Sequence, residues 1–276
     1  MKARCLRISV GPAPSHWGTG RLTSFYRQLA RGPADYVYLG ETVCSRRSRL
    51  APDLADSLHE ELSDAGKEVY ASSLILTRTE AQCRDFDDLA GRIGRIEING
   101  PAFLDLMRRY PAVGGMSLNV CNSTTARLFA RRGARRIVLP CELGLQAIRC
   151  IAERSPVAVE VVVHGHLPVA MSGTCYTARC LGQGADGCGE SCSRYPVGMV
   201  LEAGGRPMFR IDGPQTLSAG THCLIEHLPA LAAAGVHSVR ILPQVNHTGR
   251  IVRIYRDVLD GRRDSRDALS ELSALS

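Results

Sequence analysis

Four cysteines are the residues of this chain whose type and spacing are best suited to chemistry. Cys44 ends the run Y-L-G-E-T-V-C, whereas Cys175, Cys188 and Cys192 lie far downstream, the last two in a C-x3-C step. Thiolates are the ligands that soft metals prefer, and an iron–sulfur cluster usually takes four of them. One early and three late cysteines therefore predict a buried metal centre that ties two distant segments together.

The late cysteines differ from the other cysteines in their surroundings. Cysteines in apolar, periodic segments are typical of packed cores, and these are Cys83, Cys141 and Cys150. The late three lie instead in a polar, glycine-rich stretch, which favours metal binding. Zinc is the alternative metal, although structural zinc sites usually have two tight C-x2–4-C pairs and this chain has one. Spacing alone leaves both metals open.

Two further cysteines are candidates to replace one of the late ligands. Cys180 lies close to Cys175 in the sequence. Cys223 is expected at the start of a helix, where the helix dipole would favour its thiolate. We keep both as reserve ligands.

Polar residues at predicted strand ends form a second candidate site. Asn99, Asn119, Glu142 and His164 each come at or just after a strand, and we expect them to contact substrate. Glu142 is expected at a helix start and would need a partner to act as an acid or base. The sequence identifies no catalytic residue.

The elements that must position these residues alternate regularly. Strands are predicted at 4–10, 36–39, 68–74, 95–98, 116–120, 136–139, 159–163 and 238–242. Amphipathic helices are predicted at 22–30, 53–65, 80–90, 102–109, 123–132, 142–153, 223–234 and 250–259. Eight strands alternating with eight helices predict an α/β fold, a (β/α)8 TIM-barrel-like single domain.

One segment interrupts this alternation. The domain is expected to span 1–260, with a cysteine-rich insertion at 164–222 after the seventh strand and a polar, frayed C-terminal tail at 261–276. Sites in such barrels lie at the carboxyl ends of the strands. Cys44 follows the second strand and the late cysteines follow the seventh, so one edge of the barrel is predicted to collect them.

Composition narrows the class of protein. The 276 residues are 45% hydrophobic and 22% charged, as expected for a domain with a large core. The net charge of +7 comes from scattered arginines and aromatics are only 5%, which argues against nucleic-acid binding.

We find no apolar run long enough for a transmembrane segment and no signal peptide, so a cytoplasmic location is expected. Eleven cysteines there indicate metal or redox chemistry rather than disulfides.

Common catalytic motifs give no further support. The stretch from Gly182 to Gly187 matches G-x-G-x-x-G, but it neither follows a predicted strand nor opens a predicted helix. The sequence contains no G-x4-G-K-[ST], G-x-S-x-G or H-E-x-x-H. The sequence therefore contains no motif that supports a serine or zinc hydrolase.

Several stretches resemble the collagenase-like peptidase family of (β/α)8-type proteins. They are A-D-Y-V-Y-L-G at 34–40, H-G-H-L-P-V-A-M-S at 164–172 and L-P-A-L-A-A-A-G-V at 228–236. The most specific match is Y-L-G-E-T-V-C-S-R-R at 38–47. The resemblance runs from the first strand to about Tyr255, and it is greatest to a branch of the family that acts in ubiquinone biosynthesis.

This resemblance implies a specific function. Proteins of that branch carry a 4Fe-4S cluster, here implied to bind Cys44, Cys175, Cys188 and Cys192, and form a heterodimer with a UbiU-like protein. The pair supports oxygen-independent, anaerobic hydroxylation of a ubiquinone precursor, with prephenate implied as hydroxyl donor, so this chain would be a hydroxylase subunit. The alternatives are a metal-dependent collagenase-like peptidase and a non-catalytic partner subunit, in which the cluster only holds the insertion in place.

Overall fold

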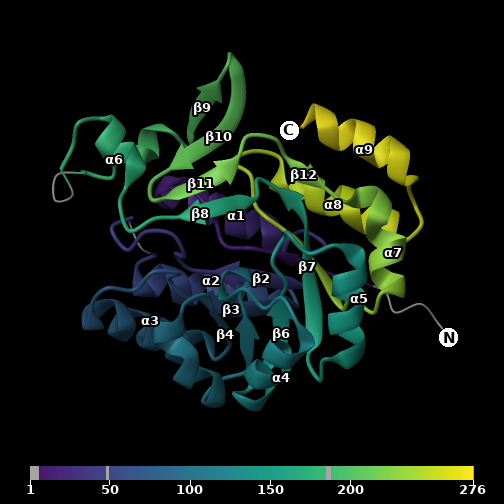
Figure 1. The fold of residues 1–276 in the computed structure, drawn as a ribbon. Coiled ribbons are helices and arrows are strands. Elements are labelled where there is room, and N and C mark those ends of the chain that lie inside the picture. Colours follow the sequence, from purple (N-terminus) through teal and green to yellow (C-terminus); the bar gives the residue numbers. More distant parts are fainter. Residues whose placement is uncertain (1–5, 48–49, 185–187, 276) are drawn as a thin grey trace.

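A closed barrel of parallel strands forms the centre of the molecule. The computed structural model describes residues 6–47, 50–184 and 188–275. Within these residues, eight strands pair in the order β7-β13-β1-β2-β3-β4-β5-β6, and β6 pairs again with β7 to close the barrel (Figure 1). Their bounds are β1 Arg7–Val10, β2 Tyr36–Leu39, β3 Glu68–Ser72, β4 Ile96–Ile98, β5 Ala112–Gly114, β6 Ala134–Val138, β7 Ala158–Gly165 and β13 Ser238–Ile241. The predicted TIM-barrel-like α/β fold is confirmed.

Helices connect the strands and cover the outside of the barrel. They are α1 Gly18–Ala30, α2 Pro52–Asp64, α3 Glu80–Ile93, η1 Pro101–Arg108, η2 Met116–Leu118, α4 Ser123–Arg131, α5 Leu145–Arg154, η5 Ile225–His227, α7 Leu228–Ala233, α8 Thr248–Leu259 and α9 Ser265–Ala274. Local sequence starts several of them. Pro52 occupies the first turn of α2, where its missing N–H is not needed. Thr79 and Gln82 form a capping box at α3.

The insertion after β7 has its own secondary structure. Its strands form a four-stranded antiparallel sheet in the order β8-β11-β10-β9. The elements are β8 Pro168–Met171, α6 Tyr176–Cys180, η4 Ser191–Arg194, β9 Met199–Ala203, β10 Arg206–Asp212 and β11 Gln215–Ser218. Figure 1 shows this sheet beside the carboxyl end of β7, with the β9–β10 hairpin projecting from the barrel. The insertion therefore stands over the edge where barrel sites are expected.

Two layers of packing fill the fold. Between strands and helices lies a large apolar core that includes Ile8, Tyr26 and Tyr255, all fully buried. Inside the barrel, a smaller cluster contains Tyr38, Tyr70 and Leu242. No helix in the described ranges is long and apolar enough to cross a membrane.

Several predicted boundaries were wrong. The fifth strand is β5 at 112–114 rather than 116–120, because residues 112–114 pair with β4 and the chain then turns into η2. The helix predicted from Glu142 begins at Leu145, after an extended Gly144. Cys223 does not open a helix; it lies in β12 (His222–Cys223), which pairs with β7.

The end of the chain was also predicted incorrectly. Residues 265–274 form α9 rather than a frayed tail, and Ala268 and Leu272 bury its apolar side. Parts of three predictions lie outside the described residues. They are the start of the first strand at 4–5, the middle of the glycine-rich stretch at 185–187 and the final residue of the tail at 276.

Candidate functional site

A cavity of about 550 Å³ lies between the loop after β2 and the insertion. Cys44, Cys175, Cys188 and Cys192 all line it. The cavity therefore brings together the four cysteines that the sequence singled out, although Cys44 lies far from the other three in the sequence. Within the described residues, neither reserve cysteine lines this cavity: Cys180 is exposed on α6, and the Cys223 Sγ lies 3.5 Å from the Tyr255 hydroxyl.

Local hydrogen bonds hold the segments that carry these thiols. The backbone N–H groups of Val43 and Cys44 donate to Glu41 Oε1, at 2.7 and 3.1 Å. The Sγ of Cys175 accepts from the N–H of Ala178 at 3.4 Å, so this cysteine caps α6. Cys44 and Cys175 are thus each held by hydrogen bonds within a short segment, and these segments meet only through the tertiary fold.

A buried arginine supplies positive charge beside two of the thiols. Arg47 is 2% exposed, and its guanidinium donates to Asp212 Oδ1 at 2.7 Å and to the carbonyl of Pro14 at 2.8 Å. The same guanidinium interacts electrostatically with the thiols of Cys192 and Cys44. A buried cation in this position favours thiolates, which are the metal-binding form of cysteine.

Burial works against that effect. It raises the pKa of Cys44, and it raises the pKa of Cys192 to about 11, while Arg47 partly offsets both changes. Without a metal, both thiols therefore hold their protons at neutral pH, and metal binding must displace them.

The donor set suits a soft metal, but the ligands are not assembled around one point. Among the described residues, no group of three or more His, Cys, Asp or Glu side chains is arranged to hold a metal ion. The chemistry of the four thiols and the adjacent Arg47 charge fits a thiolate-bound group, and binding such a group would have to draw the thiols closer together.

The mouth of the barrel forms a second cavity, of about 380 Å³. Asn99, Asn119 and Glu142 line it, as does the buried Arg240. His164, the fourth residue predicted for this site, is 1% exposed, and its ring packs edge-on against Tyr255 at 5.6 Å. The pairing of β13 with β7 is irregular at this point: the register shifts between Arg240 and Ile241, and Ile241 is the partner of His164. Burial lowers the pKa of His164 to about 4, and His166 lines the mouth in its place.

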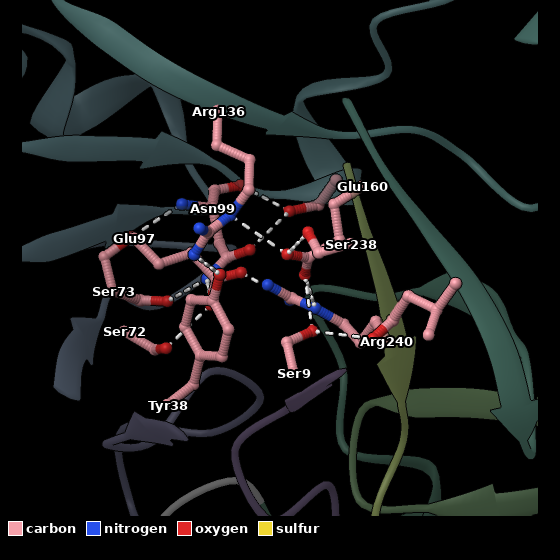
Figure 2. Close-up of polar contacts among 12 residues, drawn as sticks. Ser9, Tyr38, Ser72, Ser73, Glu97, Asn99, Arg136, Glu160, Ser238 and Arg240 are labelled. Carbon is pink, nitrogen blue, oxygen red and sulfur yellow. Dashed lines mark hydrogen bonds and ion pairs between the residues drawn. The ribbon is translucent and has the colours of Figure 1, made fainter. Parts of the chain in front are cut away.

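Below this mouth lies an ion network that sequence reasoning missed (Figure 2). Arg240 donates from Nε to Glu160 Oε1 at 2.6 Å and pairs through Nη1 with Glu97, and Arg136 Nε lies 3.0 Å from Glu160 Oε2. Burial alone would raise the pKa of Glu160, but the two arginines and hydroxyl donors hold it at about 2. The available signal was at least one charged residue inside each of the four strands β4, β6, β7 and β13, which indicates inward-facing ion pairs.

The fold and this site define a (β/α)8 barrel with a cysteine-lined cavity over its carboxyl edge. The sequence model of peptidase family U32 matches residues 20–274, and the chain belongs to that family. The tRNA hydroxylation protein P1 of Bacillus subtilis is 24% identical over 250 residues, which cover 82% of this chain and 58% of that protein. The 23S rRNA 5-hydroxycytidine C2501 synthase of Escherichia coli is 30% identical over 163 residues, covering 54% of this chain and 23% of the synthase.

A solved structure supports the fold alone. The Rubisco-like protein of Rhodopseudomonas palustris superposes with a TM-score of 0.51 at 12% identity, covering 93% of this chain and 65% of that one. The chain thus spans a little over half the length of the first curated relative, 58%, and less of the synthase.

Proposed function

We propose that the cysteine-lined cavity binds a 4Fe-4S cluster through the thiolates of Cys44, Cys175, Cys188 and Cys192. The observation that carries the proposal is that all four line one cavity. Four thiolates are the usual ligand set of such a cluster. The buried Arg47 guanidinium, which interacts electrostatically with Cys192, would offset part of the negative charge that a cluster with four thiolates brings.

The function that we assign to this chain is that of a subunit in oxygen-independent hydroxylation of a ubiquinone precursor, as in the UbiV branch of the family. Two relatives are named for hydroxylation of RNA, which supports hydroxylation as the reaction class. The sequence resemblance at 38–47 supports the ubiquinone branch. A UbiU-like protein would complete a heterodimer, and prephenate would supply the hydroxyl group.

Within this assignment, the described residues have separate tasks. The bound cluster would supply one-electron chemistry. Asn99 and Asn119 at the barrel mouth offer amide donors and acceptors, and Glu142 offers a carboxylate, with which a polar co-substrate could be oriented. The Arg47–Asp212 pair holds the loop of Cys44 against the insertion. It would so keep Cys44 close to the three late cysteines.

Anaerobic purification with iron, sulfide and zinc analysis tests the cofactor. We expect about four iron atoms and four sulfides per chain, with broad visible absorption that is lost in air. A colourless zinc protein that cleaves peptides would overturn the proposal and support the peptidase alternative.

A deletion strain tests the function. It should make normal ubiquinone in air and little without oxygen, and the wild-type gene should restore anaerobic synthesis. Normal anaerobic ubiquinone, together with loss of a hydroxylated RNA nucleoside, would overturn the assignment in favour of an RNA substrate.

A further inference from the structure

Exposed arginines surround the opening of the cysteine cavity. Arg78 and Arg179 line the cavity, and Arg194 ends η4, two residues after Cys192. All three side chains are exposed, and no ion pair joins them to a carboxylate among the described residues. Arg78 comes from the loop before α3, whereas Arg179 belongs to α6 of the insertion. The Arg78 guanidinium donates to the carbonyl of Gly173, so the two sides of the opening meet.

Carboxylates near the opening are fewer than these arginines. Glu190 is the one carboxylate in the described lining, and its Oε2 lies 2.8 Å from His16 Nε2. Glu80, at the start of α3, has the guanidinium of Arg84 at 3.7 Å. Among the described residues, the charge around the opening is therefore positive, and an acidic surface would be attracted to it.

Exposed apolar side chains accompany the arginines. Six of the nine large apolar side chains that are exposed in the described ranges lie in the insertion. Leu76 lines the cavity, Tyr176 follows Cys175, and Val197 comes three residues after η4; they are 41%, 39% and 52% exposed. Figure 1 shows α6, which begins at Tyr176, standing out from the barrel beside the sheet of the insertion. Apolar groups among polar ones at a surface are typical of a protein contact.

The mixture of charge and apolar groups indicates a transient contact. Interfaces between electron-transfer proteins are small, whereas permanent subunit interfaces are larger, more apolar and poor in charge. The β9–β10 hairpin, with Val200, Leu201 and Met208 exposed, is the more apolar surface and suits a permanent partner better. The arginines at the cavity opening suit a carrier that binds and leaves.

We infer that the basic rim of the cysteine cavity, defined by Arg78, Arg179 and Arg194, is the docking surface of an acidic one-electron carrier protein. The inference rests on the proposed function and names the partner that supplies electrons to its cluster. The four cysteines are only partly buried, so a cluster bound to them lies close to this rim. Carboxylates of the carrier face the arginines, while Leu76 and Tyr176 pack against its apolar groups.

A flavin carrier illustrates the electron balance of this step. The anionic flavin hydroquinone gives up one electron and becomes the neutral semiquinone. That electron enters the proposed cluster, which is reduced by one electron. No proton needs to move between the two proteins.

Charge reversal at the rim tests the docking surface. Arg179→Glu/Arg194→Glu replaces two exposed, unpaired guanidinium groups, so the fold should persist. Arg149→Glu/Arg154→Glu is the matched control, because both arginines are exposed on α5, which does not line the cavity. Iron and sulfide are measured in each variant first. Should the reversal variant lose iron, Arg179→Gln/Arg194→Gln takes its place, with a loss in rate of about threefold or more.

Anaerobic stopped-flow mixing with reduced flavodoxin, an acidic flavoprotein, measures the rate of cluster reduction. Reduction should be about tenfold slower or more in the reversal variant and unchanged in the control. The wild-type rate should fall as salt rises from about 0.1 to 1 M, because the screening length shortens from about 10 to 3 Å. Photoreduced deazaflavin, which needs no docking surface, should reduce all variants at similar rates.

Three results would overturn the inference, and they are distinguishable. Equal rates in the wild type and the reversal variant, at equal iron content, would remove the docking surface and leave the proposed function intact. Loss of electron transfer from flavodoxin when a UbiU-like subunit is bound would show that this subunit covers the rim instead. Absence of iron from the wild-type protein would overturn the proposed cofactor, and with it the need for a carrier.

Discussion

The guanidinium of Arg47 donates to Asp212 Oδ1 at 2.7 Å, and both side chains are almost completely buried, at 1% and 0% exposed. Arg47 lies three residues after Cys44, and Asp212 ends β10 of the insertion. Next to Asp212, the carbonyl of Gly213 accepts from the N–H of Tyr176, the residue after Cys175. This pair therefore joins the early and late cysteine segments.

Arg47→Met should lower the free energy of unfolding by about 3–5 kcal/mol, because it leaves the buried Asp212 carboxylate without its counter-charge, with Gln215 Nε2 still donating to it at 2.9 Å. Denaturant unfolding of the metal-free protein measures the change. In the double variant Arg47→Met/Asp212→Leu, the loss should be smaller than the sum of the two single losses. Strict additivity would show that the pair does not hold the insertion to the barrel.

Cys44→Ala, Cys175→Ala, Cys188→Ala and Cys192→Ala should each lower bound iron sharply, because a missing thiolate leaves one corner of the proposed cluster open to solvent. Iron and sulfide analysis after anaerobic purification measures the loss. Cys83→Ala and Cys150→Ala are matched controls, since both are partly buried in helices α3 and α5. Full iron retention by the Cys44 variant would contradict the proposed ligand set.

Glu160→Gln should destabilise the barrel by about 3–5 kcal/mol, because Arg136 and Arg240 would lose a fully buried counter-charge. Glu61→Gln is the control: Glu61 pairs with Arg27, which is more than half exposed, and such a surface pair contributes about 0–1 kcal/mol. Similar losses in the two variants, measured by thermal or denaturant unfolding, would contradict the importance of the buried network.

His164 should make stability depend on pH in a defined window. Its folded pKa, about 4, lies below the ordinary 6.5, chiefly because of burial and secondarily because of His222 and His166. As pH falls below 6.5, the unfolded state takes up this proton first, so stability is complete above 6.5 and lost on the way to 4. The loss amounts to roughly 3 kcal/mol.

His164→Gln should flatten that dependence. Unfolding free energies of the two proteins, measured from pH 7.5 to 4, should converge towards the acid end. Parallel curves would mean that His164 is not held neutral by the fold.

Local patterns were sufficient for much of the barrel. The strands at 36–39, 68–72 and 238–241 are short, rich in apolar residues and flanked by segments with helical periodicity. The local sequence pattern was therefore sufficient to locate them. The fifth strand was misplaced because 112–114 becomes a strand through its register with β4, which no local period encodes. Residues 116–120 alternate like a strand but lie outside that register.

The same division holds for the candidate sites. The type and spacing of Cys44, Cys175, Cys188 and Cys192 already singled them out as ligands, because thiols in a polar stretch have few packing roles. Their common cavity was decided by tertiary contacts such as Arg47–Asp212, which act across the whole insertion. The packing of His164 against Tyr255 was decided in the same way, because the two residues lie far apart in the sequence. Sequence determines which groups are available, whereas barrel closure and helix packing determine which of them meet.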